Sequence, residues 1–201
     1  MKKQAWPVAF ALAFLGMSSV AEAQVINIDS SSSTGVTVAL VAGADYTLAY
    51  APAGTAGATY LAWNPWGDVT GCNNLGQLCT HGWSERFRIL GTGGDLYTFS
   101  ASAGPYATAA SANISAVAGP IFGSLNGGPQ STFGSFIPFH QNNDINAVFY
   151  IPDDVYTDNL GGISLVLTRV INPVPEPETY ALMLAGLSGI GWMARRRKAR
   201  G

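Results

Sequence analysis

The chain has 201 residues, of which 48% are hydrophobic and only 11% are charged. Disordered tail proteins combine low hydrophobicity with high net charge, so this composition excludes that class and predicts a folded chain. The 24 glycines and 11 prolines follow no three-residue period, which excludes a collagen-like protein. The length favours a single domain.

The basic residues are concentrated at the two ends of the chain. Lys2 and Lys3 begin it, and five of the last seven residues are Arg or Lys. Residues 24–172 hold three arginines against nine Asp and Glu, a formal net charge of −6, although the whole chain carries only −2. An acidic central domain lacks the basic surface that binds nucleic acid, so nucleic acid is excluded as a partner.

The N-terminal 23 residues have the order of a signal peptide. Lys2-Lys3 is followed by the apolar run 6–17 and then by Ala21-Glu22-Ala23, with small residues at both recognition positions of a cleavage site. This order predicts export, cleavage by signal peptidase after Ala23 and a mature chain that begins at Gln24. A short buried helix is the alternative.

The C-terminal segment has three parts. The extended Val174-Pro175-Glu176-Pro177 is followed by the nearly uncharged stretch 179–194 and by a basic cluster at 195–198. About twenty apolar residues span a bilayer, so the stretch predicts a short transmembrane helix that snorkelling arginines extend. The basic cluster is expected to face the cytoplasm, which leaves residues 24–172 outside.

These parts resemble, in order, the PEP-CTERM sorting signal of Gram-negative bacteria. The residues that carry the resemblance are Val174, Pro175, Glu176, Pro177, Arg195, Arg196 and Arg197. The resemblance covers about residues 173–201. It implies transient anchoring in the inner membrane, processing by an exosortase, and release to the cell surface or an exopolysaccharide matrix. A plain C-terminal anchor is the alternative.

Residues 24–172 have the pattern of an all-β domain. Short runs of β-branched and aromatic residues recur between Gly, Pro, Asn and Asp clusters. They predict strands at 36–41, 46–50, 59–63, 86–90, 96–101, 145–151 and 163–170. This spacing predicts a single jelly-roll-like β-sandwich with little helix. The Gly- and Pro-rich stretch 119–138 is expected to be a long loop.

Two cysteines, Cys72 and Cys79, lie in a turn-rich segment. In an oxidising compartment such a pair most simply forms a disulfide. The spacing matches neither a C-x-x-C redox motif nor a four-ligand zinc site, so a structural disulfide is predicted.

An acidic segment before the last predicted strand suggests a metal. Calcium prefers several oxygen ligands from a loop that wraps the ion. The candidate ligands are Asp153, Asp154, Tyr156, Asp158 and Asn159, followed by Gly161-Gly162. A solvated acidic turn is the alternative, because Asp, Asn and Gly are ordinary hairpin residues.

The pattern from Asp153 to Leu165 is similar to the calcium loop of the bacterial galactophilic lectins, and the similarity covers about residues 145–168. The similarity implies a small jelly-roll sandwich in which the calcium also ligates the sugar, with Asp153, Asp158 and Asn159 as side-chain ligands and a carbonyl near Tyr156 as another. Asp158 stands where an amide is expected, and the segment between Asp153 and Asp158 is shorter than in that family.

A second cluster is rich in tryptophan. Carbohydrate sites combine an aromatic face for the apolar side of a sugar with carboxylate and amide groups for its hydroxyls. The candidate residues are Trp63, Trp66, Asp68, His81 and Trp83. In the alternative interpretation Trp63 and Trp83 belong to the core.

These patterns predict an exported, lectin-like surface or matrix protein that binds carbohydrate, with calcium as its cofactor and exopolysaccharide as its partner. A structural or adhesive biofilm matrix protein without a ligand is the alternative. A glycoside hydrolase is the third hypothesis. The chain has only two histidines, His81 and His140, and no G-x-S-x-G motif, so no enzyme is expected.

Overall fold

The computed structural model describes residues 20–91, 94–101, 104–171 and 177–198. The chain divides into two compact units, one of residues 21–171 and the other of the two chain ends. Most of the predicted signal peptide, residues 1–19, lies outside the described residues. Ala21 and Ala23 of the predicted cleavage site lie in the first strand, and both are exposed.

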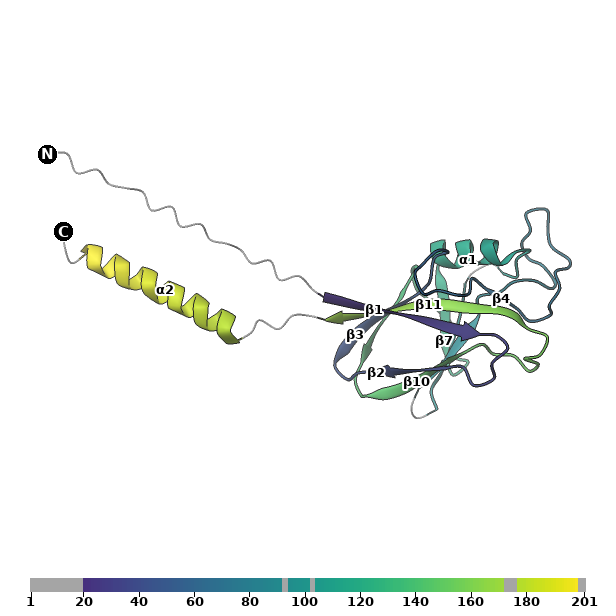
Figure 1. Ribbon diagram of the computed structural model, residues 1–201, viewed down its shortest axis with the longest axis horizontal. Helices are drawn as coiled ribbons and strands as arrows, with labels where there is room; N and C mark the ends of the chain where they lie inside the picture. The colour runs from purple at the N-terminus through teal and green to yellow at the C-terminus, as the bar shows by residue number, and fades with distance from the viewer. Residues whose placement is uncertain (1–19, 92–93, 102–103, 172–176, 199–201) are drawn as a thin grey trace. The chain divides into compact units, whose positions relative to one another are not determined.

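Residues 21–171 form two β-sheets (Figure 1). The first sheet has the strand order β1 (Val20–Asp29), β11 (Leu160–Ile171), β3 (Ala44–Tyr50), β9 (Ile137–Gln141), and β4 (Trp63–Asn64) joins it at β11. The second has the order β2 (Val36–Leu40), β10 (Ile145–Tyr150), β5 (Phe87–Leu90), β6 (Leu96–Ala101), β7 (Ile121–Leu125), β8 (Ser131–Thr132). Every ladder with a described register is antiparallel.

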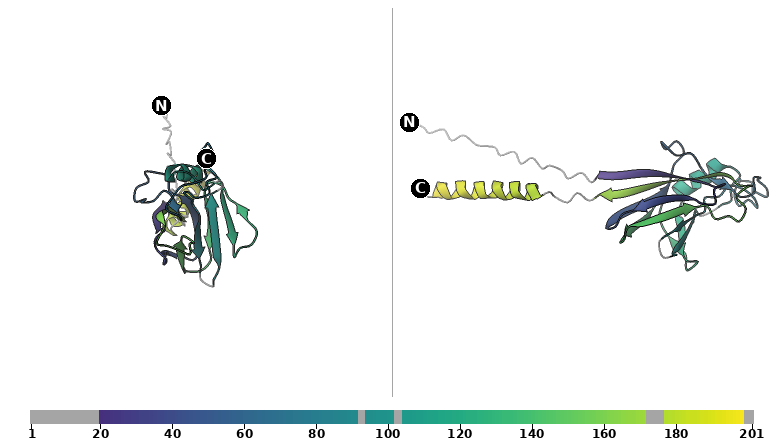
Figure 2. Two further views of the ribbon diagram at one scale, coloured as in Figure 1. Left: turned by 90° about the vertical axis from the view of Figure 1, so that its right-hand side faces the viewer. Right: turned by 60° about the horizontal axis from the view of Figure 1, so that its bottom comes forward.

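The two sheets share one hydrophobic core. Strand β3 buries every second residue, from Ala44 to Tyr50, because successive side chains of a strand point to opposite faces. Leu48 of the first sheet and Phe149 of the second are both fully buried in the same cluster. The predicted β-sandwich is therefore confirmed, whereas its finer description as a jelly roll stays a prediction. Figure 2 shows the strands of the domain from two further directions.

Six of the seven predicted strands are present. The exception is 59–63, of which only Trp63 lies in a strand. The backbone N–H groups of Thr59 and Tyr60 donate to the Ser164 hydroxyl at 3.1 and 2.9 Å instead of to a neighbouring strand. The apolar pattern at 59–63 predicted a strand, but the backbone N–H groups of this segment donate to a side chain and leave it unpaired with a neighbouring strand at Thr59 and Tyr60.

The predicted long loop at 119–138 is wrong. This stretch contains β7, β8 and the first residues of β9. The glycine at position 123 lies within β7 and serves packing, because a Cβ there would lie 2.6 Å from the Phe99 ring. A glycine that suggested a turn is thus required by an aromatic neighbour on the adjacent strand.

The expectation of little helix missed α1 (Ala109–Ala118). Thr108 caps this helix by accepting a hydrogen bond from the Ser111 N–H at 3.1 Å. Its buried face consists of Ala112, Asn113 and Ala116. Because these residues are small or polar, the helix lacks the large apolar residues at helical spacing that reveal a helix in a sequence.

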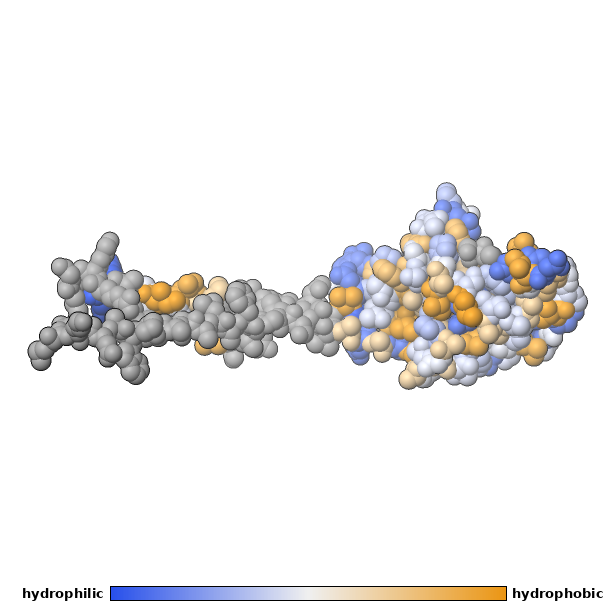
Figure 3. Space-filling view, turned by 90° about the horizontal axis from the view of Figure 1, so that it is seen from above, coloured by the Kyte–Doolittle hydropathy of each residue, from blue (hydrophilic) through white to orange (hydrophobic). Residues whose placement is uncertain are grey.

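Helix α2 (Pro177–Lys198) confirms a helix in the predicted sorting segment. Its apolar side chains are exposed, among them Leu182, Leu187 and Trp192, and some are visible in orange in Figure 3. The Arg196 guanidinium lies 3.7 Å from the centre of the Trp192 ring.

The predicted membrane span is not supported. No helix in the described part of the chain is long and apolar enough to cross a bilayer.

Gly161 and Gly162 lie where β11 meets two other backbone segments. Gly161 has φ +78°, and a Cβ there would lie 2.5 Å from the Ala62 carbonyl oxygen. A Cβ at Gly162 would overlap the Ile28 carbonyl oxygen. The Ser30 N–H and hydroxyl both donate to the Gly161 carbonyl, at 3.1 and 2.8 Å. Only glycine permits this approach of three backbones.

We expect Gly162→Ala to lower the free energy of unfolding by about 1–3 kcal/mol, because the added methyl group forces the Ile28 backbone away. Urea unfolding followed by fluorescence measures the change. Gly134→Ala is the matched control, because a Cβ there meets nothing within 4 Å. Equal stability of the two variants would show that this junction tolerates a side chain.

Candidate functional site

The tryptophan motif and the acidic segment meet in the structure. Strand β4 pairs with the start of β11, Trp63 opposite Gly161 and Asn64 opposite Leu160. In the turn that follows β4, a Cβ at Gly67 would lie 3.3 Å from the Asp158 carbonyl oxygen. Two motifs that are far apart in the sequence therefore border each other at one end of the sandwich.

A buried asparagine shapes the turn that follows β4. Asn64 is fully buried, its amide N–H donates to the Asp68 carbonyl at 2.7 Å, and its amide oxygen accepts from the Trp66 N–H at 3.0 Å. Gly67 adopts φ +68°, which suits a residue without a Cβ. The turn thereby places the side chains of Trp66 and Asp68 at the surface.

The predicted disulfide is confirmed and fixes the segment that carries His81. Cys72 and Cys79 are bonded, with their Cα atoms 3.8 Å apart. Just outside this loop, Thr70 and His81 form an antiparallel bridge, with hydrogen bonds of 3.1 and 3.3 Å between their backbones. The bridge brings His81 back beside the turn that carries Asp68.

Trp66, Asp68 and His81 form one cluster, which we call the aromatic face. The rings of Trp66 and His81 stack at 4.8 Å between centroids with an angle of 8° between their planes. His81 Nδ1 lies 2.7 Å from Asp68 Oδ1. Trp66 is 44% exposed, and the side chains of His81 and Asp68 are 36% and 54% exposed. Three of the five predicted carbohydrate contacts thus come together at the surface.

Trp63 and Trp83 do not belong to the aromatic face. Trp63 is 1% exposed, and its indole N–H donates to the Arg86 carbonyl at 3.0 Å. Trp83 is partly buried against Tyr106 and its neighbours, and its backbone pairs with that of Tyr106. Trp63 packs in the interior, so the prediction that it contacts a ligand at the surface is corrected, whereas Trp83 is only partly buried and its contact with a ligand stays a prediction.

The acidic segment is spread along the loop between β10 and β11. Asp154 and Asp158 are exposed, and Tyr156 is partly buried. Asn159 is buried, and its amide N–H donates a hydrogen bond to the Ser30 carbonyl at 2.9 Å. Among the residues that the structure describes, no three His, Cys, Asp or Glu side chains come together to hold a metal ion. Calcium binding by this loop stays a prediction.

A polar cavity of about 250 Å³ lies beside this loop. It is lined by Arg86, Arg88, Tyr150, Pro152, Asp153, Asp154 and Tyr156. The acids and Tyr156 were predicted as site residues, whereas the two arginines were not. The available signal was the alternation of Arg86 and Arg88 in the predicted strand 86–90, although in the structure Arg86 directly precedes β5.

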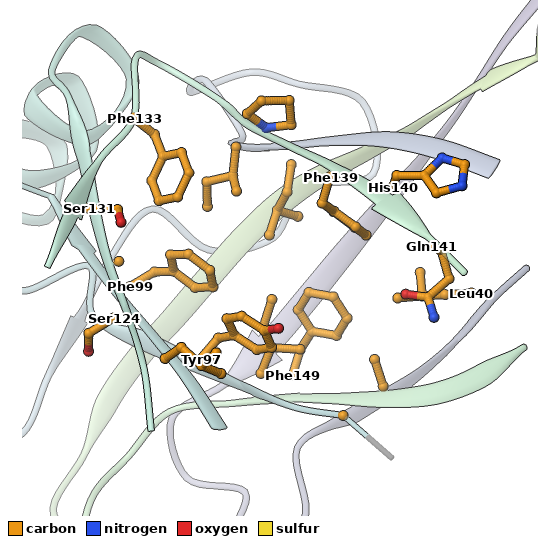
Figure 4. A pocket seen from close by; sticks show the side chains of 18 of the residues that line it. Leu40, Tyr97, Phe99, Ser124, Ser131, Phe133, Phe139, His140, Gln141 and Phe149 are labelled. Atoms are coloured by element: carbon orange, nitrogen blue, oxygen red, sulfur yellow. The ribbon is translucent and has the colours of Figure 1, made fainter. Parts of the chain in front are cut away.

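A second cavity, of about 320 Å³, lies between the sheets and is mainly apolar. Figure 4 shows Phe99 and Phe133 pointing toward it and His140 pointing away. The His140 ring instead lies 2.7 Å from Asp45 Oδ1. None of the predicted ligand contacts lines this cavity. It is a gap in the core on the side of the sandwich where β8 has only two residues.

Glu85 is a buried acid that was not among the predicted site residues. It is 2% exposed, and its Oε1 has no hydrogen-bond partner. The buried Tyr50 hydroxyl donates to its backbone carbonyl at 2.6 Å. Burial raises the pKa of the Glu85 carboxyl to about 8, so the group is neutral at physiological pH. Because Glu85 is enclosed, it does not touch a ligand at the surface.

The comparison with known families decides the identity of the C-terminal segment. Residues 173–198 match the family described as the PEP-CTERM protein-sorting motif. The chain carries a PEP-CTERM sorting motif. The motif implies an exported protein that is sorted at the membrane and processed by an exosortase. No curated protein and no solved structure matches the chain.

The PEP-CTERM motif and the candidate sites lie in different units. The motif covers α2, whereas the aromatic face and the polar cavity lie in residues 21–171. The motif therefore supports export and sorting, and any ligand must be argued from the β-sandwich itself.

We expect the protein to lose stability as the pH rises. Glu85 titrates near pH 8 when folded and near 4.5 when unfolded, so its contribution is complete below pH 4.5 and is lost by pH 8. Between pH 5 and 8 this amounts to about 4 kcal/mol in the free energy of unfolding.

Urea unfolding at a series of pH values measures this loss. Glu85→Gln keeps the shape of the side chain and removes its titration, so this variant should lose much less stability over the same range. Parallel pH profiles for the wild type and the variant would contradict the assignment.

We expect the double variant Cys72→Ser, Cys79→Ser to have a free energy of unfolding about 2–3 kcal/mol lower than that of the wild type. Without the disulfide the eight-residue loop is no longer closed in the unfolded chain, which therefore gains conformational entropy. Thermal and urea unfolding measure the loss. A reducing agent should lower the stability of the wild type and leave the double variant unchanged. A wild type that does not respond to reduction would contradict a structural role for this bond.

Proposed function

We propose that this is an exosortase-processed protein of the cell surface or extracellular matrix whose β-sandwich binds carbohydrate. The observation that carries the proposal is the aromatic face, in which an exposed tryptophan stacks on a histidine that pairs with an aspartate. The PEP-CTERM motif supports the location. Delivery to a matrix places the domain among polysaccharides.

The chemistry of the aromatic face suits a sugar. The faces of pyranose rings are apolar, and an exposed indole offers them a flat apolar surface. The adjacent Asp68 carboxylate accepts hydrogen bonds from hydroxyl groups, and the His81 imidazole donates or accepts them. A few oriented polar groups beside an aromatic surface are the usual composition of a site for a polar ligand.

The rigidity of the aromatic face favours binding. The buried Asn64 fixes the turn that carries Trp66 and Asp68, and the disulfide loop fixes His81. Side chains that are held in place before a ligand arrives lose little conformational entropy when it binds. The Trp66 and His81 rings support each other in the unbound protein.

The proposal is for binding and not for catalysis. Glycoside hydrolysis uses two carboxyl groups that flank the scissile bond. The aromatic face contributes one carboxylate, Asp68, and the neutral Glu85 is enclosed in the core. Binding at the aromatic face does not depend on calcium. The calcium hypothesis for Asp153, Asp158 and Asn159 is a separate one, and calorimetric titration of chelator-treated protein tests it.

We expect Trp66→Ala to weaken the retention of the protein on a neutral polysaccharide by about tenfold, which corresponds to about 1.4 kcal/mol. Affinity electrophoresis against a panel of neutral polysaccharides measures the retention. Phe136→Ala is the matched control, because Phe136 is an aromatic residue of similar exposure, 47% against 44%, outside the aromatic face. Retention that is equal in both variants, or absent in the wild type, would favour a structural or adhesive matrix protein.

A further inference from the structure

The polar cavity concentrates the positive charge of an acidic domain. Residues 24–172 contain three arginines, and two of them, Arg86 and Arg88, line this one cavity. Arg88 lies on β5, and Arg86 directly precedes that strand. Tyr150 lies opposite Arg88 on β10, so these two side chains share one face of the sheet.

The arginines and aspartates of the cavity do not neutralise each other. In the described part of the chain the ion pairs within 4.0 Å are those of His81 with Asp68 and His140 with Asp45. Arg86 and Arg88 make no such pair with Asp153 or Asp154, although all four line the cavity. The guanidinium and carboxylate groups that line the cavity are therefore more than 4.0 Å apart.

Two buried polar atoms at the cavity have no partner. They are Arg88 Nε and Asp153 Oδ2. The other oxygen of Asp153 is occupied, since Oδ1 accepts from the Asp154 N–H at 2.8 Å. A buried polar atom without a hydrogen bond costs about 1–3 kcal/mol, so a bound molecule that supplies both partners gains affinity.

These requirements define the chemistry of the ligand. A guanidinium group prefers a carboxylate, which it binds through two parallel hydrogen bonds. A carboxylate oxygen without a partner, such as Asp153 Oδ2, accepts a hydrogen bond from a hydroxyl group. The rings of Tyr150 and Tyr156 offer apolar walls. The volume of about 250 Å³ limits the ligand to a small group such as one sugar residue.

We propose that the polar cavity binds the carboxylate-bearing residue of an acidic saccharide, with Arg86 and Arg88 on the carboxylate and Asp153 on a hydroxyl. The inference rests on the proposed carbohydrate binding and names the class of sugar. The loop places the two sites within reach of one oligosaccharide. Tyr156 lines the cavity, and Asp158, two residues on and at most about 7 Å away along the chain, borders Gly67 of the turn between Trp66 and Asp68.

The test compares two forms of one saccharide on the purified full chain in the presence of a chelator. The probes are oligogalacturonate and its methyl ester, which has nearly the same shape without the charge. We expect the wild type to bind the acid at least tenfold more tightly than the ester by calorimetry. Arg86→Gln and Arg88→Gln should each abolish this preference. Arg86 is exposed, so its replacement keeps the test valid even if Arg88→Gln impairs folding.

Arg169→Gln is the matched control. Arg169 is the third arginine of the domain, lies on β11 and also has a buried Nε without a partner, but it does not line the polar cavity. This variant should keep the preference for the acid. An equal loss of preference in Arg169→Gln would show that net charge alone attracts the saccharide. Equal affinity of the wild type for the acid and the ester would show that the cavity does not recognise the carboxylate. Either result overturns the proposal.

Three further outcomes test how the cavity and the aromatic face bind. Binding of the acid only when calcium replaces the chelator would indicate a metal bridge and overturn direct recognition by the arginines. Neutral polysaccharide retained through Trp66, together with no preference for the acid, would leave the proposed function standing and remove the cavity. A preference for the acid that depends on Arg86, together with retention that does not depend on Trp66, would support the cavity and remove the aromatic face as a binding site.

Discussion

The contact of three backbones at Gly161-Gly162 is the constraint on which the candidate sites depend. The end of β1 reaches it through Ser30, the segment before β4 reaches it through Ala62, and β11 begins there. Because this junction aligns β4 with β11, the turn that carries Trp66 lies against the loop that carries Asp158. The glycines that suggested a wrapped ion in the sequence instead allow strands to approach, and that approach assembles the surface.

Much of the fold was predictable because its strands follow local rules. Strand β3 alternates buried and exposed residues, and β2 pairs with β10 in a register that buries Val38 beside Ala147. The errors have particular causes. Thr59 and Tyr60 give their N–H groups to the Ser164 hydroxyl, Gly123 fits beneath an aromatic ring, and α1 buries alanine and asparagine. Each depends on a partner distant in the sequence, which local patterns do not contain.

The candidate site was predictable in its residue types but not in its grouping. Trp66, Asp68 and His81 were identified together and lie together, because the short disulfide loop keeps sequence neighbours close in space. Trp63 and Trp83 have the same chemistry, yet the pairing of β4 directs Trp63 to the carbonyl of Arg86 in the core. Arg86 and Arg88 were not predicted as site residues because the aspartates that line the same cavity come from the loop after β10, more than sixty residues later in the chain.

The net charge of the domain acts on an acidic saccharide differently from the cavity. A charge of −6 over residues 24–172 repels a polyanion at long range, but at physiological ionic strength this repulsion is screened beyond about 8 Å. A guanidinium in direct contact with a carboxylate is screened far less. The domain would therefore accept a carboxylate in the cavity in spite of its negative net charge. Raising the salt concentration weakens the repulsion more than the contact, so at physiological ionic strength the contact with the guanidinium groups decides whether the carboxylate binds.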